Sequence, residues 1–174
     1  MRLVNFVLRG RIQANGGVLE LINCTIDGAE LPETTNGGFG IAGGDVRLTG
    51  TDVSNFPGGG LEVTGGTLDL DDCALSGNGQ GSAARFGALR INGGAVTMSR
   101  TRVEGNGRWS SDCVDGTECV KGGGVRLIQG SVELSAGSYL KSNRAFEGSS
   151  IYFDSTNEGA RRALLACCLP ADGR

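Results

Sequence analysis

The feature that most constrains the fold is a glycine pair that recurs between two short segments of alternating apolar and polar residues. In the clearest copy, GLEVTGGTLDLDDCALSGN, apolar residues occupy every second position before and after Gly65 and Gly66. A period of two is typical of a β-strand that is buried on one face. A segment this short cannot bury its own apolar face, so it must stack on other copies. The repeat therefore predicts a solenoid of short strands.

The other copies keep this core and differ in the length of chain that follows it. Their glycine pairs lie at residues 16–17, 43–44 and 93–94. A fifth copy has a relaxed bend at Gln129 and Gly130, and a sixth begins with Ile151 and is not completed. A constant core with variable connections indicates a coil of fixed cross-section, with loops of variable length inserted at one corner. The expected loops cover residues 29–36, 79–86 and 107–121.

Alignment of the copies predicts four columns of inward apolar side chains, because a solenoid stacks equivalent residues about 4.8 Å apart. The columns are Ile12/Phe39/Leu61/Leu89/Val125, Ala14/Ile41/Val63/Ile91/Leu127, Leu19/Val46/Leu68/Val96/Val132 and Leu21/Leu48/Leu70/Met98/Leu134. The same alignment places opposite charges side by side on the outward positions: Arg47 lies between Glu20 and Asp69, and Glu62 lies beside Arg90. Such pairs contribute about 0.2–1 kcal/mol each and favour this register.

The copies GGVLELINCTIDG, GGTLDLDDCALSGN and GGAVTMSRTRVEGN resemble the right-handed parallel β-helix superfamily. This superfamily includes pectate lyases, tailspikes, adhesins and the polymorphic outer-membrane-protein repeats. The resemblance implies an all-β fold, a right-handed parallel β-helix of about five coils over residues 12–156. Residues 1–11 are then an N-terminal strand or cap, and residues 157–174 a C-terminal cap or tail. Within that last segment, Asn157 is expected to begin a short helix that runs through Leu169.

Composition excludes several kinds of chemistry. The chain has no histidine, which rules out Ser-His-Asp and Cys-His catalysis and histidine-based metal sites. The net charge is −3 and the basic residues are scattered, so we expect no nucleic-acid partner. No run of about 18 apolar residues is present, so we expect no membrane-spanning helix. The first residues lack the apolar segment of a signal peptide.

Asp69 and Asp71 belong to the strongest acidic cluster of the sequence. The β-helix lyases hold calcium with aspartates on an outward strand face, so the resemblance makes these two residues candidate calcium ligands. Calcium needs about six oxygen ligands, and Arg47 and Arg90 compete for the same carboxylates. A solvated charged face is therefore the favoured interpretation, and no other cofactor is expected. The galacturonase pattern also requires a histidine and an Arg-x-Lys motif, which the chain lacks.

Two cysteine pairs have different expected roles. Cys113 and Cys119 lie in the longest loop, where a disulfide between them would indicate an oxidising compartment; the alternative is a pair of free thiols. Cys24 and Cys73 share one inward column but are two coils apart, beyond the reach of a disulfide. They are expected to be small buried side chains.

Four asparagines recur after the last strand of a copy: Asn55, Asn78, Asn106 and Asn143. Asparagine tolerates a positive φ better than most residues and bonds to nearby backbone groups. The sequence therefore predicts that these four residues occupy tight turns.

The candidate binding surface lies on the loops. Trp109, the only tryptophan, stands beside Arg108 in the longest loop, and Phe86 lies at the end of the preceding one. An exposed tryptophan in such a loop favours contact with a partner, although Trp109 could equally fold back over the coil. We expect these three residues to form a surface for a protein partner or a larger assembly.

The favoured function is a non-catalytic structural or binding module, extracellular, at the cell surface or lumenal. The alternative is a carbohydrate-active lyase or hydrolase that uses acidic residues of the outward face, with carbohydrate as its partner. An ice-binding protein is less favoured, because it needs a flat row of outward threonines. Thr49, Thr64 and Thr97 are scattered instead.

Overall fold

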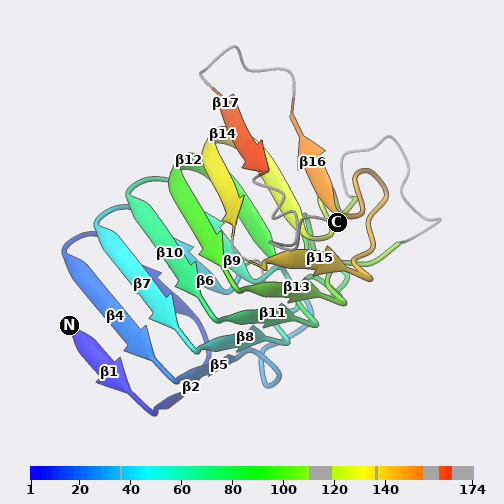
Figure 1. Ribbon diagram of the computed structural model, residues 1–174. Helices are drawn as coiled ribbons and strands as arrows, with labels where there is room; N and C mark the ends of the chain where they lie inside the picture. Colours follow the sequence, from blue (N-terminus) through cyan, green and yellow to red (C-terminus); the bar gives the residue numbers. More distant parts are fainter. Residues whose placement is uncertain (36, 110–118, 136, 155–160, 166–174) are drawn as a thin grey trace, which may run out of the picture.

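The computed structural model describes residues 1–35, 37–109, 119–135 and 137–154, together with the backbone of residues 161–165. Within these residues every regular element is a β-strand, and the strands lie in three rows along the molecule (Figure 1). Each strand pairs in parallel with the equivalent strand of the neighbouring repeat. The described chain is therefore all-β, with parallel strands curled into a solenoid-like arrangement, as the repeat predicts.

The rows are named in the order in which the chain visits them within one repeat. Row 1 contains β3 (Ile12–Ala14), β6 (Phe39–Ile41), β9 (Leu61–Val63), the first parts of β12 (Leu89–Ser99) and β14 (Val125–Ser135), and β16 (Ile151–Phe153). Row 2 contains β1 (Arg2–Val4), β4 (Val18–Ile22), β7 (Asp45–Thr49), β10 (Thr67–Asp71), the remainders of β12 and β14, and β17 (Arg161–Leu165). Row 3 contains β2 (Val7–Arg9), β5 (Thr25–Asp27), β8 (Asp52–Ser54), β11 (Ala74–Ser76), β13 (Arg102–Glu104) and β15 (Tyr139–Lys141).

The predicted inward columns are confirmed by the strand register. Leu70, for example, pairs with Leu48 on one side and Met98 on the other, and all three side chains are at most 1% exposed. The apolar core lies between the rows and runs the length of the stack. Alternation thus places one residue in two in this core, while the others face outward.

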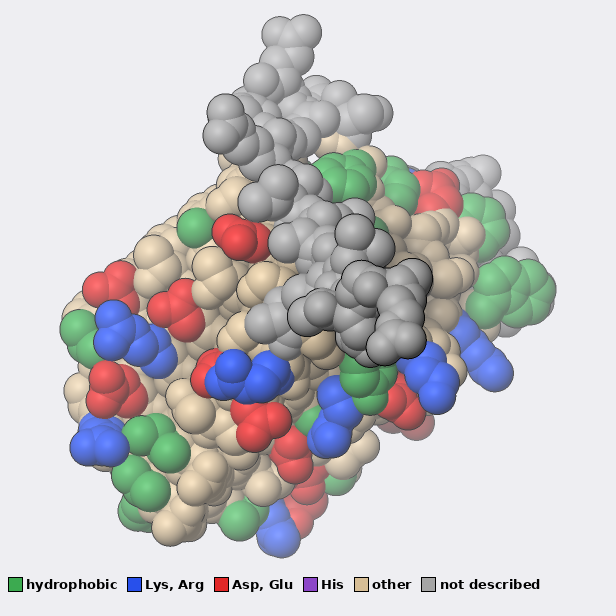
Figure 2. All heavy atoms as spheres, viewed as in Figure 1, with side chains coloured by type: hydrophobic (Ala, Val, Ile, Leu, Met, Phe, Trp, Pro, Cys, Tyr) green, Lys and Arg blue, Asp and Glu red, His purple; other side chains and the backbone are tan. Residues whose placement is uncertain are grey.

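The outward charges also follow the predicted register. Arg47 forms ion pairs with Glu20 at 3.8 Å and with Asp69 at 3.7 Å, and Arg90 pairs with Glu62 at 2.8 Å. Figure 2 shows acidic and basic side chains interspersed over the face that row 2 presents in this view. Exposed pairs of this kind add little stability, but they neutralise the face.

The glycine pairs form the bend between row 1 and row 2. Gly44 has a φ of 81°, and a Cβ added there would lie 2.3 Å from the carbonyl oxygen of Gly17 in the neighbouring repeat. Gly66 stands in the same relation to Gly44, with a φ of 77° and 2.3 Å to that carbonyl oxygen. Stacked bends therefore approach so closely that no side chain fits, which explains why the glycine pair recurs.

The corner between row 2 and row 3 is here called the tight corner. In the repeats from β4 to β13 it connects the two strands through two residues. The first has a positive φ in successive repeats, as at Asn23 (52°), Gly50 (57°) and Asp72 (54°). The second is buried and bonds to a neighbouring repeat: the N–H of Cys24 donates to Oγ1 of Thr51 at 3.2 Å. Cys73 and Thr101 repeat this bond at 3.4 Å, from N–H to Oγ1. The expectation that Cys24 and Cys73 are buried is confirmed, and both are free thiols.

The expected helix after Asn157 is wrong for the residues that the structure describes there. Residues 161–165 form β17, which pairs in parallel with Gly130–Leu134 of β14. Without this partner, that part of β14 would present unpaired backbone groups at a sheet edge, and satisfying them outweighs a weak helix propensity. The sixth copy therefore continues beyond Phe153, with β16 in row 1 and β17 in row 2. Asn157 itself lies outside the described residues.

Candidate functional site: a groove at the loop corner

The corner between row 3 and row 1, here called the loop corner, contains the connections whose length varies between repeats. After four of the row 3 strands, β8, β11, β13 and β15, the next residue has a positive φ. These residues are Asn55 (59°), Gly77 (64°), Gly105 (64°) and Ser142 (55°). The residue after each of them points inward, and these are Phe56, Asn78, Asn106 and Asn143. Of the four asparagines predicted to occupy tight turns, only Asn55 has a positive φ. The other three bond to backbone carbonyls, as predicted, but do so from the inward position that follows the residue with positive φ.

The three inward asparagines form a hydrogen-bonded ladder across the repeats. Oδ1 of Asn106 accepts bonds from the backbone N–H and from Nδ2 of Asn78, both at 3.0 Å. Asn106 then repeats both bonds to Oδ1 of Asn143 at 3.0 Å. Its Nδ2 also donates to the carbonyl oxygen of Leu75 at 2.8 Å. Because these groups are buried, each bond satisfies an atom that would otherwise be costly to bury.

Two buried phenylalanines, Phe56 at a ladder position without an asparagine and Phe86 at the end of a loop, also point inward at this corner. Phe56 is fully buried, and its backbone N–H donates to Oδ1 of Asn78 at 3.1 Å. Phe86 is 3% exposed and packs on Gly59, where an added Cβ would lie 2.5 Å from its ring. The assignment of Phe86 to an exposed binding surface is therefore corrected: its side chain supports the loop from inside, because a glycine leaves room for the ring.

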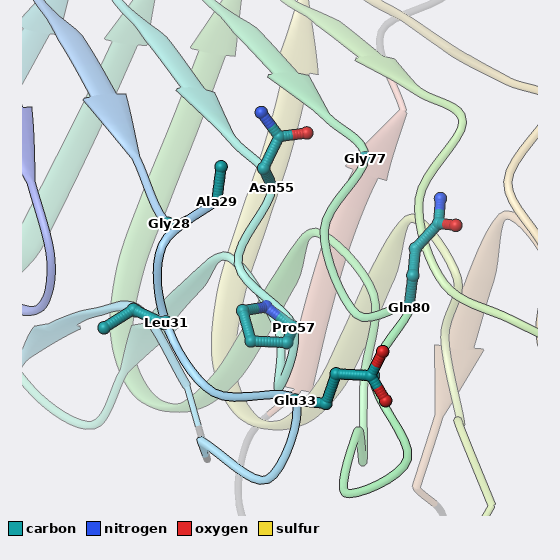
Figure 3. A pocket seen from close by; sticks show the side chains of 9 residues that line it. Gly28, Ala29, Leu31, Glu33, Asn55, Pro57, Gly77 and Gln80 are labelled. Carbon is teal, nitrogen blue, oxygen red and sulfur yellow. The ribbon is translucent and has the colours of Figure 1, made fainter.

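Outside this ladder, the loops border an open hollow of about 400 Å³. Its walls come from the loop after β5 and from the chain after β8 and β11 (Figure 3). The lining residues are Gly28, Ala29, Leu31, Glu33, Asn55, Pro57, Gly77, Gln80 and Gly81. In Figure 3, Glu33 and Gln80 lie near each other on one side of the hollow, away from Leu31 and Ala29.

A second hollow of about 430 Å³ continues along the same corner. It is lined by Gln80, Gly105, Gly107, Arg108, Trp109, Ser142 and Arg144. Gln80 belongs to both hollows and is fixed by a bond from its Nε2 to the carbonyl oxygen of Gly105 at 2.9 Å. We call the two hollows together the corner groove. The positive-φ residues Asn55, Gly77, Gly105 and Ser142 all line it.

The two ends of the corner groove differ in charge. Trp109 is 64% exposed and stands with Arg108 and Arg144 at one end, whereas Glu33 lies at the other. Nη2 of Arg108 donates to the carbonyl oxygen of Ser82 at 3.5 Å. In the described part of the chain, no carboxylate forms an ion pair with Arg108 or Arg144. Most of the other arginines whose side chains the structure describes, Arg47 and Arg90 among them, have such a partner.

Of the three residues predicted to form a contact surface, Trp109 and Arg108 line the corner groove and Phe86 is buried. The structure brings Trp109 and Arg108 together with Gln80 and Arg144, which sequence reasoning missed. A faint signal existed: the dipeptide Gly-Asn ends row 3 in two repeats, and the residues that follow it form the groove. Which later residues meet there depends on how the loops fold, and local sequence does not specify that.

The candidate calcium ligands already have partners. Asp69 accepts a bond from Oγ1 of Thr97 and pairs with Arg47, and Asp71 is bonded to Ser99 and Arg100. Among the residues that the structure describes, no group of three or more acidic, cysteine or histidine side chains could hold a metal ion. The outward aspartates therefore stabilise the strand register here.

Cys119 is buried and disulfide-bonded. Cys113 lies outside the described residues, so the pairing of these two cysteines stays a prediction. Over the described ranges, no helix is long and apolar enough to cross a membrane.

Comparison with known proteins adds no relative. No protein-family model, curated protein or solved structure matches the chain. The function is therefore argued from the geometry of the corner groove.

Proposed function

We propose that this chain is a non-catalytic binding or structural module that contacts a protein partner through the corner groove. In this proposal it is a right-handed parallel β-helix of about five coils, and β17 contributes to the cover at its C-terminal end. The observation that supports the proposal best is the groove itself, which joins two hollows of about 400 and 430 Å³ beside an exposed tryptophan.

The contrast between the groove and the strand faces supports this assignment. On row 2, the charges of Glu20, Arg47 and Asp69 compensate one another. At the groove, Arg108 and Arg144 have no compensating carboxylate among the described residues. An exposed aromatic residue beside arginines is the composition that protein interfaces favour. We therefore assign contact to the loop corner and a scaffolding role to the strand rows.

The proposed compartment is extracellular, cell-surface or lumenal. Its support is the disulfide of Cys119, since disulfides persist in oxidising compartments.

Site-specific photocrosslinking in the cells that naturally make the protein tests the contact surface. A photoreactive amino acid replaces Gln80 in the groove or, as the matched control, Glu133 on the outward face of row 2. We expect a crosslinked partner protein from position 80 and none from position 133. Equal crosslinking at both positions, or crosslinking from position 133 alone, contradicts the proposal.

An activity assay separates the module from the carbohydrate-active alternative. The purified chain is incubated with polygalacturonate, with and without calcium, and the release of new chain ends is measured. We expect no turnover. Turnover that is lost in Asp69→Asn or Asp71→Asn would assign catalysis to the outward face and overturn the non-catalytic proposal.

A further inference from the structure

We infer that the corner groove binds an extended peptide segment of a partner protein, with acidic residues at the Trp109 end. This inference rests on the proposed function and specifies the chemistry of its partner. Arg108 and Arg144 both line this end, and neither has an ion-pair partner in the described chain. The chain as a whole carries a net charge of −3, so this is a local cationic site on an acidic protein.

The donors and acceptors of the site match those of a peptide. Guanidinium groups bind carboxylates in paired hydrogen bonds. Gln80 is held through its Nε2, and its Oε1 bonds to no donor among the described residues, so it can accept a backbone N–H. The indole of Trp109 is 64% exposed and offers an apolar face for a neighbouring side chain. A carboxylate, an N–H and an apolar group occur together along an acidic peptide.

The far end of the groove argues against a uniformly anionic chain such as a polyuronate. Glu33 is exposed there and forms no ion pair within the described residues. An anionic sugar chain that followed the groove from Arg144 would bring a carboxylate against Glu33. A peptide avoids this repulsion, because acidic residues at one end can be followed by neutral or basic residues at the other.

Peptide binding can be followed through the fluorescence of Trp109, because it is the only tryptophan. The full chain is titrated with a synthetic peptide in which a glycine spacer joins a run of glutamates to a run of lysines, here called the block peptide. Tryptophan emission is recorded during the titration. We expect a saturable shift to shorter wavelength as the indole leaves water, weaker at higher salt. Arg144→Gln should raise the dissociation constant about tenfold or more, since it removes a charged hydrogen-bonding group. Glu33→Gln should raise it a few-fold.

The controls distinguish the outcomes. Arg11→Gln removes another exposed arginine without an ion pair, at the first repeat, and should leave binding unchanged. A lysine-only peptide of the same length should give no shift. The inference is overturned by no shift with the block peptide, by a shift that Arg144→Gln leaves unchanged, or by tighter Arg144-dependent binding of an oligogalacturonate. In any of these cases, crosslinking from position 80 would still support the proposed function.

Discussion

The tight corner and the loop corner use the same local device with different results. In both, a residue with positive φ ends one strand, and the next side chain turns inward to bond with a neighbouring repeat, as at Thr51 and Asn106. At the tight corner the next strand starts after two residues in the repeats from β4 to β13, so the connection has the same length in each of them. At the loop corner the chain first forms a loop outside the stacked strands, and these loops line the groove. A ladder of inward side chains therefore anchors each repeat and leaves the loops outside it free to vary.

The most severe test removes the centre of the asparagine ladder. Asn106→Leu should reduce the free energy of unfolding by about 3–5 kcal/mol, because it leaves the N–H and Nδ2 of Asn78 and the carbonyl of Leu75 without their bonds, each worth about 1–3 kcal/mol when buried. Urea unfolding measures the loss. The matched control is Asn55→Gly, which changes an exposed asparagine of the same corner and should stay within about 0.5 kcal/mol. Equal losses would mean that the ladder does not anchor the loops.

The second test uses pH to probe the tight corner. Burial raises the pKa of the Cys73 thiol from its ordinary value of 9.0 to about 11, and hydrogen bonds from the backbone of Thr51 and Asp71 lower it by less. The unfolded chain therefore loses this proton first, so stability is complete below pH 9 and falls as pH rises toward 11. The loss should reach about 2–3 kcal/mol, at 1.36 kcal/mol per pKa unit.

Cys73→Thr is the matched variant, because threonine occupies this position at Thr51 and Thr101. Urea midpoints of the two proteins, measured across this pH range, should diverge above pH 9, with the wild type falling faster. Parallel curves would show that the Cys73 thiol is not protected from ionisation by the fold.

A third, smaller effect is expected from the hydroxyl group of Thr101 at the tight corner. Thr101→Val leaves the N–H of Cys73 without its acceptor and should cost about 1–2 kcal/mol of stability. Thr101→Cys should cost less, since Cys24 and Cys73 fill equivalent positions. Thermal or urea unfolding of the two variants gives the comparison. If Thr101→Val lowered the free energy of unfolding as much as Asn106→Leu does, the buried hydrogen bonds of the two corners would contribute equally to stability, contrary to this prediction.

Alternation and the glycine pair were sufficient to predict the register of the strands. A shift by one residue would have turned Leu48 and Leu70 outward and Arg47 inward, so only one alignment buries the apolar set. The backbone conformation of the loop corner was harder to predict from the sequence. Asn55 and Asn78 look equivalent in the sequence, yet Phe56 fills the inward position in that repeat, which leaves Asn55 at the positive φ.

The groove and the last strand depend on contacts that are distant in sequence. Phe86 is buried because Gly59 leaves space for its ring, and no local pattern reveals that space. Residues 161–165 form a strand because β14 offers an unpaired edge, which outweighs local propensity. Gln80 and Arg144 meet in the groove although they come from different repeats. Sequence reasoning therefore predicted the strand scaffold and two of the residues that line the corner groove, whereas the arrangement of the loops required the structure.

The smallest expected effect separates the anchoring role of the loop corner from its binding role. Gly105 has a φ of 64° and lines the groove, and an added Cβ would meet nothing within 4 Å. Gly105→Ala should therefore cost about 1–2 kcal/mol of stability, from the backbone conformation alone. Gly105→Asn should cost less, because asparagine tolerates this conformation and Asn55 occupies the equivalent position.

The asparagine side chain would nevertheless extend into the groove, so Gly105→Asn should weaken binding of the block peptide severalfold while the urea midpoint changes little. Tryptophan emission and urea unfolding of this one variant measure the two properties separately. If stability and binding fell together, the floor of the groove would be part of the anchor, and the division between an inward ladder and a variable outer surface would not hold at this corner.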